Sequence, residues 1–126
     1  MADQLLLDTH AFIWWRENSS RLSNDAPGLI ASAGVVFVSG ASAWEAAIKT
    51  ALGKLSLPES FEAGALASRF DKLPIDFSHA EAVATLPRHH NDPFDRMLIA
   101  QAMTERLTLV THDRRFAPYH IDVVWT

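Results

Sequence analysis

The chain has 126 residues, a formal net charge of −4 at pH 7 and no cysteine. With 48% apolar and 21% charged residues, it has the size and composition of one globular domain, which excludes disorder as its main state. The lack of cysteine excludes disulfides and thiolate zinc sites, and the negative charge excludes bulk electrostatic attraction to nucleic acid.

We expect one domain over residues 1–126, in a reducing compartment such as the cytoplasm. The first ten residues, MADQLLLDTH, contain three consecutive leucines with no basic residue before them, so we expect neither a signal peptide nor a membrane anchor. No later apolar run approaches the ~20 residues of a membrane span, and we expect no association with membranes.

Short apolar runs rich in β-branched residues predict five strands, at residues 4–7, 35–39, 73–76, 107–111 and 121–125. Helical patterns predict six helices between them, at residues 11–17, 27–33, 41–52, 61–70, 78–86 and 93–106. This alternation is typical of a parallel sheet that helices cover on both faces.

Four carboxylates lie close to the predicted strand ends. Asp8 follows the first strand, and Glu45 lies on the helix after the second. Asp95 lies at the start of the helix that leads into the fourth strand, and Asp113 comes just after that strand. Because ligands bind beyond the carboxyl ends of parallel strands, the sequence predicts that these acids share one edge of the sheet.

Each acid also has a purely structural interpretation. Asp8 can cap the helix after it, Ser42 with Glu45 fits a capping box, and Asp113 can start a turn. Glu45 can also pair with Lys49 one turn later. Since the helix around Glu45 is apolar on nearly all sides, we expect this glutamate to be buried and to need a partner.

The segment DPFD at residues 92–95 contains Asp95 and one further carboxylate, Asp92, and the two have different interpretations. Asp92 precedes a proline and is typical of a helix N-cap. Capping therefore explains Asp92 well and Asp95 less well. A metal contact by Asp92 stays open.

Converging carboxylates would repel one another strongly. At ~4 Å and an effective dielectric constant near 20, each pair costs roughly 4 kcal/mol. Such a site takes up protons or binds a hard cation, and a donor set of oxygens alone favours Mg²⁺, with Mn²⁺ as the alternative, over zinc. The bound metal would also present positive charge to a phosphodiester.

Four segments, in this order, carry a resemblance to a known family: LLLDTHAFIW at 5–14, ASAWEAAIK at 41–49, HNDPFDRMLIAQA at 90–102 and LTLVTHDRRF at 107–116. Together they resemble the PIN-domain ribonucleases, in particular the VapC-like toxins of bacterial type II toxin–antitoxin pairs. The resemblance implies a three-layer α/β/α sandwich whose five-stranded parallel sheet has the order 3-2-1-4-5. It also implies an acidic metal site formed by Asp8, Glu45, Asp95 and Asp113.

The same resemblance implies a reaction and partners. The reaction is metal-dependent hydrolysis of RNA that leaves 5′-phosphate and 3′-hydroxyl ends. Asp8 and Asp95 would hold the principal Mg²⁺, while Glu45 and Asp113 would complete its shell or a second site. The implied partners are the RNA substrate, a cognate antitoxin and a second copy of the chain in a homodimer.

Basic side chains adjoin the acids in sequence and are candidates for phosphate contacts, since arginine and lysine dominate recognition of the nucleic-acid backbone. The candidates for substrate binding are Arg88, Arg96, His112 and Arg114, and His89, His90 and Arg115 lie beside them. Alternatively, Arg96 pairs with Asp92 on its own helix and the arginines after Asp113 are solvated surface. A zinc site at the histidines lacks the helical spacing that such sites show.

Four large apolar residues are consecutive, at Phe12, Ile13, Trp14 and Trp15. At ~100° per residue they would spread around most of a helix, so we expect at least one to face outward. Trp14 and Trp15 are therefore candidates for partner contact, with the antitoxin or a second copy. The alternative is a helix buried on both sides, with all four residues in the core.

Two other classes of function stay open. A phosphotransferase with an aspartate nucleophile would use the same sheet edge, but the segment DTH lacks the paired acid of that class. A catalytically inactive PIN-like module for protein binding is the second alternative, and the presence of all four acids disfavours it.

Overall fold

The computed structural model describes residues 3–126. Five strands form one parallel sheet in the order β3-β2-β1-β4-β5, which confirms the predicted sheet and its order. Leu5 pairs with Val36 on one side and with Thr108 on the other, so β1 is the central strand. The strands are Gln4–Leu7 (β1), Val35–Ser39 (β2), Asp71–Leu73 (β3), Thr108–Thr111 (β4) and Val123–Trp125 (β5).

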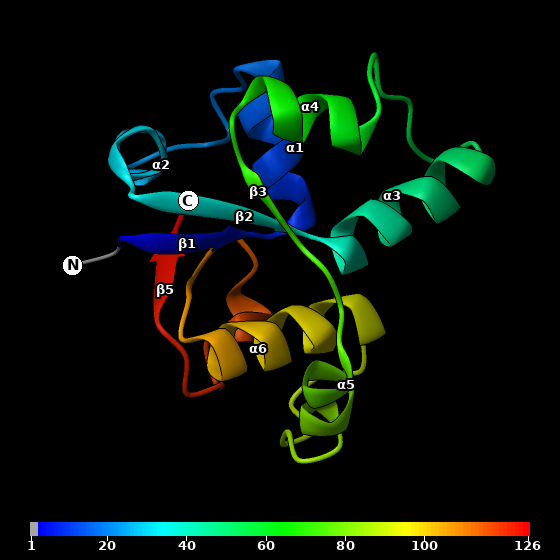
Figure 1. Cartoon of the computed structure of the whole chain (residues 1–126), viewed down its shortest axis with the longest axis vertical. Helices are drawn as coiled ribbons and strands as arrows, with labels where there is room; N and C mark the ends of the chain where they lie inside the picture. Colours follow the sequence, from blue (N-terminus) through cyan, green and yellow to red (C-terminus); the bar gives the residue numbers. More distant parts are fainter. Residues whose placement is uncertain (1–2) are drawn as a thin grey trace.

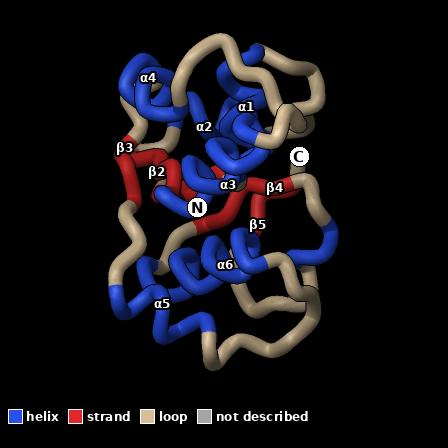
Figure 2. Tube along the Cα trace, turned by 90° about the vertical axis from the view of Figure 1, so that its right-hand side faces the viewer, coloured by secondary structure: helices blue, strands red, loops and turns tan. Residues whose placement is uncertain are grey.

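Helices cover both faces of the sheet and complete the predicted three-layer sandwich. Figure 1 shows α1, α2 and α4 on one side of the sheet and α5 and α6 on the other, and Figure 2 shows the same layers after a quarter turn. The helices are Thr9–Glu17 (α1), Ala26–Ser32 (α2), Gly40–Ala51 (α3), Phe61–Ala67 (α4), Phe77–Val83 (α5) and Pro93–Glu105 (α6), with a 3₁₀ turn at Arg114–Phe116.

The central strand is buried on both faces. Leu5 and Leu7 pack into the cluster beneath α1 and α2, whereas Leu6 points the other way into the cluster beneath α6. All three leucines are 0% exposed. A run of consecutive apolar residues is what a strand between two helical layers requires.

The third strand differs from its prediction. We predicted it at residues 73–76, but it ends at Leu73 because Pro74 has no N–H to donate to a ladder. Asp76 instead caps α5, where its side chain accepts from the His79 N–H. Helix α4 ends three residues before the predicted residue 70, because Arg69 takes a left-handed conformation (φ 59°) that turns the chain into β3.

Among the helices of residues 3–126, none combines the length and hydrophobicity that a membrane span needs.

Candidate functional site

A cavity of about 280 Å³ opens at the carboxyl ends of the strands, the edge that faces the viewer in Figure 2. The structure brings all four predicted acids to this cavity, although they come from four separate parts of the chain. Its lining residues are Asp8, Thr9, His10, Glu45, Lys49, Asp92, Asp95, His112, Asp113 and Arg115.

Asp8 lies at the junction between β1 and α1 and is 6% exposed. One oxygen, Oδ1, accepts from the Ala11 N–H at 2.8 Å, which confirms the predicted N-cap. The other, Oδ2, accepts from the Thr111 hydroxyl at 2.6 Å. Burial raises the pKa of Asp8 above its usual value, and the two hydrogen bonds oppose that shift.

Glu45 is buried on α3 and has the partners that its burial requires. Its Oε1 accepts from the Thr9 hydroxyl at 2.6 Å, and its Oε2 accepts from Lys49 Nζ at 2.8 Å. The predicted ion pair one helical turn away is confirmed.

The predicted capping box at Ser42 and Glu45 is wrong. Helix α3 starts at Gly40, and its cap is Ser39, whose hydroxyl oxygen accepts from the Ala41 N–H. Ser42 therefore lies inside the helix, where its buried hydroxyl has no hydrogen-bond partner among the described residues. It precedes Glu45 by three residues and so lies close to the same face of α3.

Asp95 lies in the first turn of α6, and its pKa is raised like that of Asp8. Asp92 caps this helix by accepting from the N–H groups of Phe94 and Asp95 at 2.9 and 3.1 Å, which confirms its predicted capping role. Burial raises the pKa of Asp95 to about 7, and the remaining contributions come from the carboxylates of Asp92, Asp8, Asp113 and Glu45. Its Oδ2 also lies 3.3 Å from His90 Nε2.

Asp113 starts the 3₁₀ turn after β4 and is held by one arginine. Arg115 donates to its carboxylate from the backbone N–H at 3.0 Å, from Nε at 3.1 Å and from Nη2 at 2.6 Å. These hydrogen bonds hold the pKa of Asp113 below its usual range. Arg115 Nη2 also lies 3.8 Å from Asp95 Oδ2.

The donor set of this cavity fits a hard divalent cation. Five carboxylates line the cavity, and only Lys49 and Arg115 bring permanent positive charge to its lining. Oxygen donors with excess negative charge are the ligands that Mg²⁺ and Mn²⁺ prefer.

Outside the cavity, a second set of side chains places its potential metal-ligand atoms closer together. Within residues 3–126, ligand atoms of three such side chains come within 4.8 Å of one another only at Asp76, His79 and Glu105. Hydrogen bonds explain this cluster, because His79 Nδ1 accepts from the Asp76 N–H and Nε2 lies 2.7 Å from Glu105 Oε2. The carboxylates of the cavity are spaced more widely, so a shared cation would have to draw them together.

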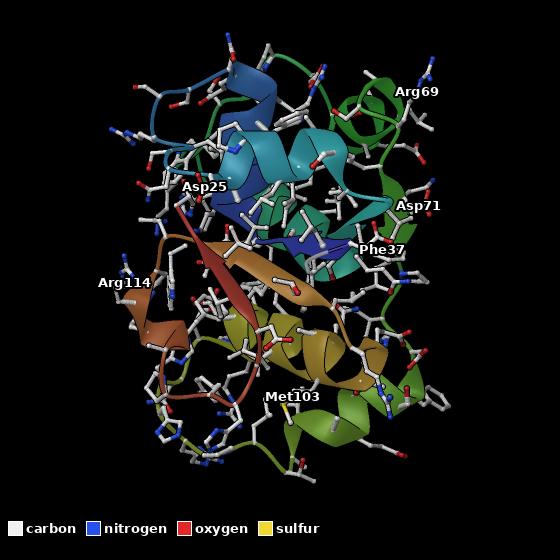
Figure 3. All side chains as sticks on the ribbon, turned by 90° about the vertical axis from the view of Figure 1, so that its left-hand side faces the viewer. Asp25, Phe37, Arg69, Asp71, Met103 and Arg114 are labelled. Carbon is white, nitrogen blue, oxygen red and sulfur yellow. The ribbon has the colours of Figure 1, made fainter. Side chains whose placement is uncertain are left out.

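Of the four predicted substrate-binding residues, His112 alone lines the cavity. Arg96 turns away and donates to the carbonyl oxygens of Val83, Leu86 and Pro87 at the end of α5. Arg114 lies over the Trp125 ring, 4.3 Å from its centroid, and Figure 3 shows it at the outer edge of the molecule. Arg88 is exposed and lies outside the cavity lining.

The expectation of an outward-facing aromatic residue on α1 is wrong. Phe12, Ile13 and Trp14 are buried, and Trp15 is half-buried with its Nε1 donating to the Ser68 hydroxyl. The cause is a second layer over α1, where the Phe61 ring of α4 packs 4.8 Å from that of Phe12. Partner contact through Trp14 and Trp15 stays a prediction. The exposure of these side chains that suggested it is not found.

Two threonines that hold the acids were missed from the sequence, and Arg115 was expected among the phosphate contacts and not as the partner of Asp113. Thr9 and Thr111 donate hydroxyl hydrogen bonds to Glu45 and Asp8, and Arg115 holds Asp113. A signal was present, because each threonine lies next to or near an acid at a strand end, in DTH and THD.

The hydrogen bond from Thr111 to Asp8 predicts a pH-dependent stability effect. Thr111→Val keeps the shape of the side chain but removes the donor, so the free energy of unfolding should fall by about 1–3 kcal/mol near neutral pH. The loss should shrink at about pH 4, because a protonated Asp8 no longer carries the charge that the hydroxyl stabilises. Denaturant unfolding at both pH values measures this, with Thr108→Val on the same strand as the control. An equal loss at both pH values would contradict the role assigned to Thr111.

Comparison with known proteins shows the family of this chain. A family model described as the PIN domain matches residues 5–120. No curated protein matches the chain.

Several solved structures share the fold. The chain is similar to VapBC2 from Rickettsia felis bound to a DNA fragment from their promoter, at 14% identity over 96% of this chain and 97% of that one, with a TM-score of 0.71. It is similar to a toxin–antitoxin complex from Klebsiella pneumoniae, at 22% identity over 95% of each chain and a TM-score of 0.67. It is also similar to VapBC-5 from Mycobacterium tuberculosis, at 17% identity over 98% of this chain and 99% of that one, with a TM-score of 0.62. The chain belongs to the PIN-domain family.

Proposed function

We propose that this protein is a divalent-metal-dependent endoribonuclease and the toxin of a toxin–antitoxin pair. The observation that carries the proposal is the cavity in which four separate chain segments place Asp8, Glu45, Asp95 and Asp113. The carboxylates of the cavity lining outnumber its positive charges, and the pKa values of Asp8 and Asp95 are raised, which shifts both acids toward protonation. A dication bound at this sheet edge would neutralise the excess negative charge.

Each acid has its own part in the proposed reaction. Asp8 and Asp95 would hold the principal Mg²⁺, and Glu45 and Asp113 would complete its shell or a second site. When bound, the metal lowers the pKa of its water ligand and offsets charge on the attacked phosphate. Thr111 orients Asp8 with its hydroxyl, and His112 at the cavity wall is positioned to contact the substrate backbone.

The choice of RNA and of a toxin role rests on the motif resemblance and on the family. Both the RNA substrate and a cognate antitoxin would be met in the cytoplasm, where we propose that the protein acts. The structural neighbours include VapBC and other toxin–antitoxin complexes, which supports an antitoxin as partner. An apolar groove between α1 and the chain before α4, lined in part by Phe12, Ile13, Leu57 and Phe61, is the surface we propose for it.

The cavity should be tested as the metal and catalytic site with a matched pair of variants. Asp95→Asn should lower Mg²⁺-dependent cleavage of a single-stranded RNA by more than about 100-fold, because it removes a charged metal ligand. Glu105→Gln neutralises an acid of the other cluster, where an amide oxygen can still accept from His79, and should cleave at the rate of the unaltered protein. EDTA should abolish cleavage in both the unaltered protein and Glu105→Gln.

Other outcomes point to other functions. Cleavage that survives in Asp95→Asn, or that Glu105→Gln abolishes, would remove the proposed site. Absence of cleavage in the unaltered protein, with Mg²⁺ bound or not, would favour the inactive binding module.

The raised pKa of Asp95 predicts how metal binding depends on pH. The folded-state pKa of about 7 exceeds the usual 3.8, so the metal-free protein loses stability as the pH rises from about 4 to about 7. Mg²⁺ binds the ionised form and should restore that stability, so it should raise the melting temperature at about pH 8 and hardly at all at about pH 5.

The control is Asp95→Asn, which should melt at a higher temperature than the metal-free unaltered protein at about pH 8 because the repulsion is gone. A rise in melting temperature with Mg²⁺ that is the same at both pH values would contradict this account.

A stripe of exposed apolar side chains on α3 and at its C-cap is our candidate for the homodimer contact. Trp44, Ile48 and Leu52 lie at four-residue spacing and are 61%, 37% and 63% exposed. The Trp44 ring meets the edge of the Phe94 ring of α6 at 5.2 Å, which extends the apolar surface to a second helix. Exposed apolar surface of this kind marks contact sites, and a two-fold dimer would place the same stripe on both copies.

The oligomeric state of two leucine variants tests this surface. Leu52→Glu should convert a dimer to a monomer in sedimentation analysis, because it buries a charge at the contact. Leu66→Glu, which changes a leucine of equal exposure (66%) on α4, should leave the dimer intact. A monomeric unaltered protein, or a dimer that survives in Leu52→Glu, would refute this interface.

A further inference from the structure

The cavity contains a positive group of the chain itself, the guanidinium of Arg115. Its Nε and Nη2 donate to both oxygens of Asp113, and Nη2 lies 3.8 Å from Asp95. Arg115 thus stands between two carboxylates that a shared cation would have to draw together. The contact is bidentate, a geometry that arginine and carboxylate adopt with high specificity.

Arg115 is anchored at its backbone, and carboxylates hold its guanidinium at a solvent-exposed position. The backbone N–H donates to Asp113 Oδ1 at 3.0 Å, whereas 60% of the side chain is exposed. With most of the side chain in solvent, the guanidinium can swing outward once its hydrogen bonds to Asp113 are lost. The hydrogen bonds from Arg115 already use the roughly four lone-pair sites of the Asp113 carboxylate, so a dication that binds Asp113 would have to displace the guanidinium.

We infer that Arg115 is a resident counter-ion of the metal-free site, which competes with the divalent cation for Asp113 and is released toward the substrate phosphate when the cation binds. This inference rests on the proposed function, since it assigns a positioning role at the same site. The exchange keeps a positive charge beside Asp113 in both states, so the excess of carboxylates is partly compensated with and without the metal. It also frees a planar, five-donor group at the mouth of the cavity, where a phosphodiester would lie.

The competition makes a prediction that a merely structural contact does not. If Arg115 only supported the site, Arg115→Gln would weaken metal binding. If it competes, Arg115→Gln should tighten Mg²⁺ or Mn²⁺ binding by about 3- to 10-fold in calorimetric titration, the range expected for loss of a solvent-accessible, hydrogen-bonded ion pair.

The chain offers a charge-matched control in the neighbouring residue. Arg114→Gln removes the same charge one residue away, but its guanidinium lies over Trp125 and outside the cavity lining. Its metal affinity should change by less than about 2-fold, since charges in solvent are largely screened. Equal tightening in both variants would show a general charge effect and overturn the inference.

A second measurement observes Arg115 in the unaltered protein, so it needs no variant. In ¹⁵N spectra of arginine Nε groups, Mg²⁺ should move the Arg115 resonance to the position of a solvated guanidinium. Arg16, whose Nε donates to Glu59 at 2.6 Å outside the cavity lining, serves as internal control and should not move. An Arg115 resonance that Mg²⁺ leaves in place would overturn the inference.

The outcomes separate this inference from the proposed function. If the unaltered protein binds no Mg²⁺, both fall. If it binds Mg²⁺ and loses binding in Asp95→Asn, but Arg115→Gln binds equally or more weakly, the metal site stands and the role of Arg115 is refuted.

Discussion

The repulsion among carboxylates at one sheet edge is the constraint on which the rest of the site depends. The parallel topology creates it, because all strands of such a sheet end at the same edge and place their next residues there. The structure offsets the repulsion in three ways: hydroxyl donors at Thr9 and Thr111, cations at Lys49 and Arg115, and raised pKa values at Asp8 and Asp95. A bound cation could replace each of these hydrogen bonds, ion pairs or protons.

The central strand fixes the first acid in place. Leu5, Leu6 and Leu7 are fully buried between the two helical layers, so β1 cannot slip by one residue without turning its side chains to the wrong faces. Asp8 comes directly after them and is bound to α1 at one oxygen and to β4 at the other. The hydrophobic core thereby sets the position of a charged group that would otherwise avoid burial.

The sequence predicted what depends on local pattern and missed what depends on distant packing. The buried strands and the caps at Asp8 and Asp92 could be predicted from local residue order, and the order of the sheet from the motif resemblance. The burial of Trp14 could not, because the layer over α1 comes from a segment some fifty residues later. Similarly, Arg96 comes directly after Asp95 on the same helix, but a step of ~100° turns it toward the carbonyl oxygens of α5.

Helix α3 links the candidate site to the candidate contact surface. Glu45 and Lys49 line the cavity, while Trp44 and Ile48, each one residue earlier, lie in the exposed apolar stripe. Neighbouring residues on a helix differ by ~100° in direction, so one rigid element presents a charged row to the cavity and an apolar row to solvent. A partner seated on the stripe would contact the same helix that carries Glu45, so the proposed contact surface and the proposed metal site share one element.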